Sequence, residues 1–91
     1  SATWVMPFKY VLRSLQTIAD VAAGVGQTFT YTVSVGGSDQ SITSSTAGQT
    51  SADNVNEYAG SKADGVALKL VTSAGAGVAR HQGNVEIEEI P

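Results

Sequence analysis

Hydrophobic and polar side chains alternate without interruption over residues 28–35, which is the clearest pattern in the chain. The hydrophobic positions are Phe29, Tyr31, Val33 and Val35, and threonine or serine occupies the positions between them. Successive side chains of a β-strand point to opposite faces, so this pattern predicts a half-buried strand. The Gly-Gly pair that follows can supply the positive φ angles of a tight hairpin turn.

Weaker alternation occurs near both ends of the chain. Residues 1–8 place Trp4, Met6 and Phe8 on one side, and Pro7, which lacks an N–H group, restricts this segment to an edge strand or a strand end. Residues 66–72 and residues 78–90 show the same period of two. Within the last segment, Val85 and Ile87 alternate with Glu86 and Glu88.

Residues 10–23 fit two different patterns. Leu12, Leu15 and Ile18 recur at a spacing that suits an amphipathic helix. The segment is also rich in β-branched residues, and a clear strand follows it closely. We favour a strand with a bulge over a helix.

The remaining segments read as short strands and turns. They are a polar strand at 40–46 whose one large apolar residue is Ile42, a loop at 48–53, a short strand at 54–59 that offers Val55 or Tyr58 to the core, and turns at 60–65 and 73–77. Seven or eight short strands with glycine-rich connections are typical of an antiparallel β-sandwich. We therefore predict an all-β fold with a single domain over residues 1–91.

The composition argues against several kinds of partner. Five Lys and Arg residues against eight Asp and Glu give a net charge of −3, which disfavours nucleic acid as a ligand. No apolar run approaches the length of about 20 residues that a membrane-spanning helix needs. The chain has no cysteine, and only 14% of its residues are charged. Such a low share fits an extracellular or particle-bound β-protein.

The sequence offers no assembled catalytic or metal centre. His81 is the only histidine, and no second histidine or cysteine stands at ligand spacing, so we expect a surface or interface role for it. Arg80 could bind a carboxylate or a sugar, although an exposed structural role is the simpler interpretation. Glu86 and Glu88 share one face of a strand, and they could contribute to a cation site or form a solvated face that discourages edge-to-edge pairing. We favour the solvated face and predict no enzymatic activity and no cofactor.

Short carboxylates and exposed aromatic rings complete the set of candidates. Three aspartates, Asp39, Asp53 and Asp64, lie in segments that we expect to be turns, where a carboxylate can cap backbone amides. Four aromatic residues, Trp4, Tyr10, Tyr31 and Tyr58, could form a sugar-stacking platform or a subunit interface, and packing in the core explains them at least as well. The candidate interface or ligand contacts are Trp4, Met6, Phe8, Tyr10, Tyr58, Arg80 and His81.

Several motifs resemble those of small phage and prophage structural domains with a jelly-roll sandwich. The matching positions are Met6-Pro7-Phe8, Leu12 and Leu15, residues 23–33, Gly37-Ser38-Asp39, residues 42–45, residues 64–69, and Val85-Glu86-Ile87-Glu88. The resemblance covers most of the chain. It departs from the family pattern at Gly65, which follows Asp64, and at Ala23, which stands where a proline is frequent.

The resemblance implies a role on a virion. Domains of this kind act as capsid decoration proteins, fibre tips or receptor-binding modules, and their jelly rolls are commonly trimeric, like the tumour-necrosis-factor and complement globular heads. For this chain it implies a homotrimer that binds the major capsid protein or another virion protein and stabilises the particle. The alternative is a carbohydrate-binding module of a phage tail or cell-surface protein, with a host-surface glycan as its ligand.

Overall fold

A computed structural model describes residues 3–73, 75, 77 and 79–91 of the chain. Every regular element among these residues is a β-strand. The strands are β1 (Thr3–Val5), β2 (Tyr10–Ala19), β3 (Phe29–Val35), β4 (Ser38–Thr46), β5 (Thr50–Gly60), β6 (Gly65–Thr72) and β7 (His81–Glu89). The predicted strands at 1–8 and 78–90 and the predicted turn at 73–77 lie partly outside the described residues.

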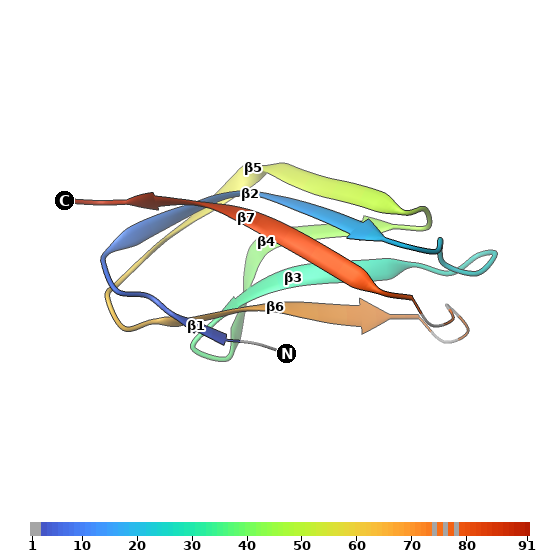
Figure 1. Ribbon diagram of the computed structural model, residues 1–91, viewed down its shortest axis with the longest axis horizontal. Helices are drawn as coiled ribbons and strands as arrows, with labels where there is room; N and C mark the ends of the chain where they lie inside the picture. Colours follow the sequence, from blue (N-terminus) through green and yellow to red (C-terminus); the bar gives the residue numbers. More distant parts are fainter. Residues whose placement is uncertain (1–2, 74, 76, 78) are drawn as a thin grey trace.

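The strands form two antiparallel sheets, which confirms the predicted all-β sandwich (Figure 1). One sheet has the order β1-β6-β3-β4, and the other has the order β5-β2-β7. A jelly roll consists of eight strands arranged in two Greek keys. The observed strand order does not confirm that connectivity, so the jelly roll stays a prediction.

Strand β3 carries the pattern that the sequence shows most clearly. Phe29, Tyr31, Val33 and Val35 are all buried, and the polar residues between them are half-buried. The chain then turns through Gly36 and Gly37, whose φ angles are 59° and 83°, and Val35 pairs with Ser38. A two-residue turn with two positive φ angles matches the right-handed twist of the strands that it joins.

Strand β2 occupies the centre of the other sheet, and it confirms the predicted strand with a bulge. Its register with both neighbours shifts between Arg13 and Leu15, and the bulged residue Ser14 has a φ of 41°. The extra residue reverses the alternation, so Leu12 before the bulge and Leu15 after it both face the core. The spacing that resembled a helix is therefore two strand segments in opposite phase.

Replacing Ser14 by glycine should stabilise the protein. A positive φ is strained for serine and unstrained for glycine, so we expect the free energy of unfolding to rise by up to about 1 kcal/mol. Urea denaturation of Ser14→Gly beside the wild type measures the change. A clear loss of stability would show that the serine side chain contributes more to the bulge than the strain costs.

Strand β5 begins earlier than the sequence predicts. The loop expected at 48–53 is wrong beyond residue 49, because β5 starts at Thr50 and Asp53 is a buried residue of that strand. Val55 is fully at the surface, and Tyr58 packs against the core instead. Polar residues such as Ser51 and Asp53 suit a loop by propensity, but here they bond to neighbouring strands.

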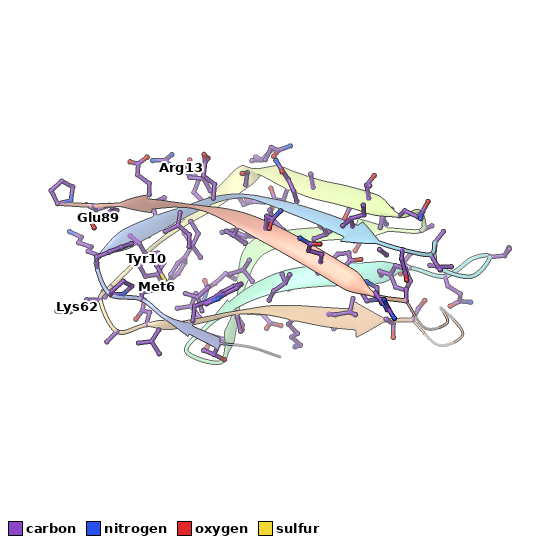
Figure 2. The ribbon with its side chains drawn as sticks, in the orientation of Figure 1. Met6, Tyr10, Arg13, Lys62 and Glu89 are labelled. Carbon is purple, nitrogen blue, oxygen red and sulfur yellow. The ribbon has the colours of Figure 1, made fainter. Side chains whose placement is uncertain are left out.

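One corner of the sandwich is organised around Tyr10 (Figure 2). Tyr10 is fully buried, its ring lies over the backbone of Gly60, and its hydroxyl donates to Oδ2 of Asp64 at 2.9 Å. The same carboxylate oxygen accepts the N–H of Ser61 and so closes the predicted turn between β5 and β6. Burial and the bond to Asp64 raise the pKa of the Tyr10 phenol.

The two flanks of the sandwich differ. On one flank, β4 and β5 follow each other in the chain and are joined by a bond between the hydroxyls of Ser44 and Ser51 at 2.9 Å. On the other flank, the outermost strands of the described residues are β1 and β7, which are not consecutive in the chain. Like β4 and β5, each of them pairs with one neighbour in its own sheet, but no bond between described residues joins them across the sheets. We call this side the open flank and the side of β4 and β5 the closed flank.

Candidate functional site

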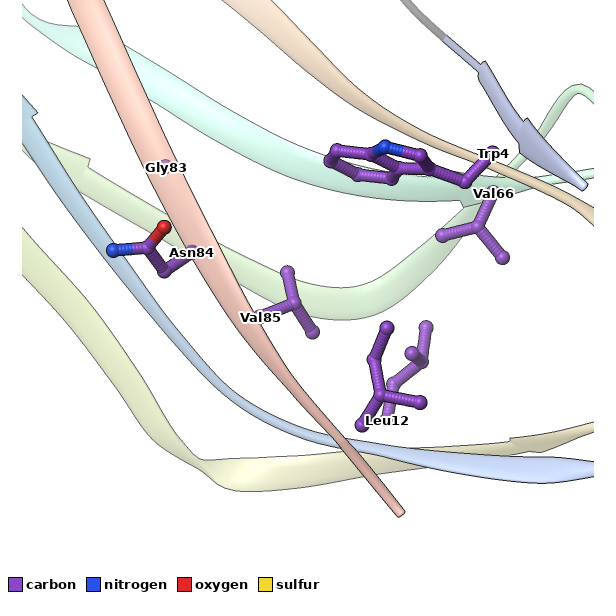
Figure 3. Close-up of a pocket in the computed structure, with 7 residues that line it drawn as sticks. Trp4, Leu12, Val66, Gly83, Asn84 and Val85 are labelled. Carbon is purple, nitrogen blue, oxygen red and sulfur yellow. The ribbon is translucent and has the colours of Figure 1, made fainter. Parts of the chain in front are cut away.

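A groove runs along the open flank between the two sheets (Figure 3). It has a volume of about 230 Å³. Residues from four strands line it: Trp4, Leu12, Val66, Gly83, Asn84, Val85 and Ile87. Most of these side chains are apolar, so the groove exposes the edge of the hydrophobic core.

Trp4 and Ile87 are the most exposed apolar side chains of the groove. Trp4 sits on β1 opposite Val66 and is 51% exposed, and Ile87 near the end of β7 is 45% exposed. Burying apolar surface stabilises an assembly by about 25 cal/mol per Å². Covering Trp4 and Ile87 with another surface would therefore lower the free energy of the assembly.

Gly83 brings β7 close to the other sheet. A Cβ atom at this position would collide with the side chain of Leu68 on β6. Because the glycine leaves that space free, Leu68 packs directly over the β7 backbone. Trp4 and Val66 lie across the groove from β7 (Figure 3).

Charged residues lie on the outer surface of the β5-β2-β7 sheet. Arg13 on β2 contacts Glu57 of β5 at 2.6 Å and Glu88 of β7 at 3.3 Å. These two carboxylates raise the pKa of the Arg13 guanidinium. Exposed pairs of this kind contribute little to stability, so the acidic outer row of β7 is available for other contacts.

A second hollow of about 230 Å³ lies at the start of β7, lined by Ile18, Asp20, Arg80, His81 and Gln82. His81 is half-buried there. Its Nδ1 lies 2.8 Å from the Tyr31 hydroxyl, and its ring packs edge-on against Phe29 at a centroid distance of 4.6 Å. Burial raises the pKa of Tyr31. The hydrogen bond to Tyr31 and the contact with Phe29 therefore attach His81 to the edge of the hydrophobic core.

Asp53 is the most strongly perturbed carboxylate of the protein. Its side chain accepts hydrogen bonds from the backbone N–H groups of Thr43, Val55 and Asn56 and from the Asn56 side-chain amide, at 2.9 to 3.1 Å. Burial raises the pKa of Asp53, but the four hydrogen bonds outweigh it and lower the pKa to about 2. Because Thr43 belongs to β4, the carboxylate links the two sheets at the closed flank.

The three aspartates that we expected in turns have different roles. Asp64 does cap a turn, through Ser61. Asp53 caps local amides as predicted, but it does so inside β5 rather than in a loop. Asp39 lies in β4, where its carboxylate contacts Lys69 at 3.1 Å.

The structure separates the residues that the sequence offered as contacts. Met6 and Tyr10 are buried in the core, and so is Tyr31, so the predicted platform of exposed aromatic rings is wrong. Their side chains fill the space between the sheets. An alternation pattern shows which residues share a face of a strand, but it does not show whether that face is buried or exposed. Phe8 and Tyr58 are half-buried against the core. Trp4 and Arg80 remain at the surface, in different hollows.

The sequence interpretation missed most of the groove. Alternation did place Val85 and Ile87 on one face of the last strand, which was the one available signal. Leu12 joins them because β2 pairs with β7, and Val66 joins them because β6 lies in the facing sheet. Asn84, on the opposite face of its strand in the sequence pattern, carries the polar group at the rim of the groove.

The described residues form neither a cluster of metal ligands nor a membrane-spanning helix. None of their histidine, aspartate and glutamate side chains gather in groups of three or more that could hold a metal ion. The described part of the chain also contains no helix with the length and apolar character needed to cross a membrane.

Comparisons with known proteins identify no relative. No family model matches the chain, no curated protein is significantly similar to it, and no solved structure matches its fold significantly.

Proposed function

We propose that this protein is a structural domain of a bacteriophage virion, of the capsid decoration or fibre type. The phage assignment comes from the resemblance of the sequence motifs. The observation in the structure that supports a structural role is the open flank, where an apolar groove lies between two free strand edges. The domain acts by shape and by burial of this surface, without turnover.

The physical argument rests on the small size of the core. A chain of 91 residues without cysteine has neither a large core nor a disulfide to stabilise it. Covering the open flank with a neighbouring subunit would bury Trp4 and Ile87 and extend the core. A second copy of the chain, the major capsid protein or another virion protein could supply this covering surface. The three-fold assembly implied by the resemblance is an alternative to the two-fold contact inferred below.

Sedimentation with phage particles tests the virion role. We expect the purified protein to sediment with intact particles of its phage and to saturate at a fixed ratio to the major capsid protein. Particles should then withstand heat or dilution better. Binding without saturation, or an absence from virions purified from infected cells, would contradict the proposal.

Replacing Trp4 by alanine should weaken the association at the open flank. A large aromatic residue at the centre of an apolar interface commonly contributes enough for a tenfold change in affinity or more. We expect at least tenfold less protein on particles at subsaturating concentration. The matched control is Val25→Ala, which removes exposed apolar surface far from the groove. Equal retention of both variants would argue against this flank.

Carbohydrate binding is the second candidate function, because the groove combines an aromatic ring with an amide. Trp4 can stack on a sugar ring, and the amide of Asn84, which lies on the outer face of β7 beside the groove, can bond to a hydroxyl. A glycan array distinguishes the two functions. Binding of one sugar by the isolated domain, lost in Trp4→Ala and in Asn84→Ala, would place sugar recognition first.

A further inference from the structure

Strand β7 presents a long free edge on the open flank. It extends over nine residues and, among the described strands, pairs only with β2, whereas β1 on the facing sheet has three residues. Beyond its ends, the carbonyl of Arg80 accepts the N–H of Asp20, and the N–H of Ile90 donates to the carbonyl of Lys9. Backbone groups alternate in direction along a strand. The groups that point away from β2 are therefore those of His81, Gly83, Val85, Ile87 and Glu89.

We propose that β7 pairs with β7 of a second copy of this chain, antiparallel about a two-fold axis at Val85. The two three-stranded sheets would then join into one sheet of six strands. The inference rests on the proposed function and deepens it, because it names the subunit that covers the open flank. A closed two-fold contact uses the same surface on both copies and leaves neither β7 edge free.

The backbone groups select this kind of register. A two-fold axis at Val85 places Val85 opposite the partner's Val85, Gly83 opposite the partner's Ile87, and His81 opposite the partner's Glu89. All of these residues direct their N–H and C=O groups to the edge of β7 that no other described strand covers. Each facing pair can therefore exchange two backbone hydrogen bonds, and the whole length of β7 is matched to itself.

The inward face of the paired strands is apolar. Ile87, which is half exposed, lies beside the partner's Gly83, where Leu68 of the same subunit packs over the β7 backbone. Ile87 therefore meets an apolar surface twice, once on each side of the axis. The same contacts extend the apolar lining of the groove next to Trp4.

The outward face is complementary in hydrogen bonding. Glu86 lies beside the partner's Asn84, and Glu88 lies beside the partner's Gln82, so each carboxylate meets an amide that can donate to it. An axis at Glu86 would instead place two glutamates directly opposite each other, which is destabilising. We expected Glu86 and Glu88 to discourage edge-to-edge pairing. In this register they face amides, and they disfavour registers in which two glutamates would face each other.

Cysteine pairs can test both the contact and its register. Residues 84 and 86 of the two copies face each other at positions without backbone bonds, where Cβ atoms approach to about 4.5 to 5.5 Å. The chain has no cysteine of its own. We expect the double variant Asn84→Cys, Glu86→Cys to form a covalent dimer under mild oxidation, seen on a non-reducing gel.

The single variants serve as register controls. Asn84→Cys alone would link two copies only about an axis at residue 84, and Glu86→Cys alone only about an axis at residue 86, so both should stay monomeric on the gel. No dimer from the double variant, or equal linking by a single variant, would overturn the proposed register.

Light scattering of the wild type measures the molar mass in solution and so tests the dimer without cysteine variants. We expect the mass of two chains at high concentration, and the mass of one chain for Ile87→Lys, which sets a charge against the partner's Gly83. Val55→Lys on β5 is the matched control and should stay dimeric. A monomer or a trimer for the wild type would overturn the pairing. If such a protein still saturated phage particles, the virion role would stand without it.

Discussion

Gly60→Ala is expected to destabilise the protein by about 2 to 3 kcal/mol, within the range for an overpacked core. A Cβ atom on Gly60 would collide with the ring of Tyr10 and would lie 2.7 Å from Oδ2 of Asp64. Tyr10 has no room to retreat because it is fully buried, and the shift would also break its bond to Asp64. Urea denaturation measures the loss.

Gly48→Ala is the matched control for this variant. A Cβ atom at Gly48 would lie 3.5 Å from Thr46 Oγ1 and otherwise meet open space, so the free energy of unfolding should change little. The double variant Gly60→Ala, Tyr10→Leu should recover part of the loss, because a smaller side chain relieves the collision. Equal stability of Gly60→Ala and wild type would mean that Tyr10 does not lie over residue 60.

Asp53→Ala is expected to cost about 3 kcal/mol. The substitution leaves the N–H groups of Thr43 and Val55 without their acceptor, and an unpaired buried polar group costs about 1 to 3 kcal/mol. It also releases the link between β4 and β5 at the closed flank. Amide hydrogen exchange should then rise first at Thr43 and Val55. Unchanged protection at both amides would contradict this role.

The same carboxylate makes the stability of the protein depend on pH. The hydrogen bonds lower the pKa of Asp53 in the folded protein from 3.8 to about 2. A lowered folded pKa stabilises the protein above the unfolded value, and the stabilisation is lost as the pH falls from about 4 towards 2. Asp53→Asn removes this contribution. Its stability difference from the wild type should shrink as the pH falls through that window.

Local alternation was a reliable guide wherever one face of a strand is buried. It predicted the buried row of β3 and the hairpin at Gly36-Gly37. It also predicted the bulged β2, because the β-branched residues there outweighed the helical spacing. These features depend on neighbours in the chain, so a single sequence contains the information for them.

Alternation failed where polar residues are buried by long-range contacts. Ser51 and Asp53 read as a loop, yet β5 starts at Thr50, because Thr17, Ser44 and Thr43 from other strands satisfy their polar groups. The sequence left Tyr10 undecided between a surface contact and the core, and the core position depends on Asp64, which accepts the hydrogen bond of its hydroxyl. Such partners lie far away in the sequence and leave no local pattern.

The order of hydrophobic and polar residues by itself determined that this chain forms short strands with one buried face, and where most of those strands lie. Only the tertiary structure decided which strands stand at the edges, and so which apolar residues form a groove on the open flank. The physical reason is that alternation shows only to which face of its own strand a side chain points. The exposure of Trp4 and the free edge of β7 depend on which strands are neighbours in space.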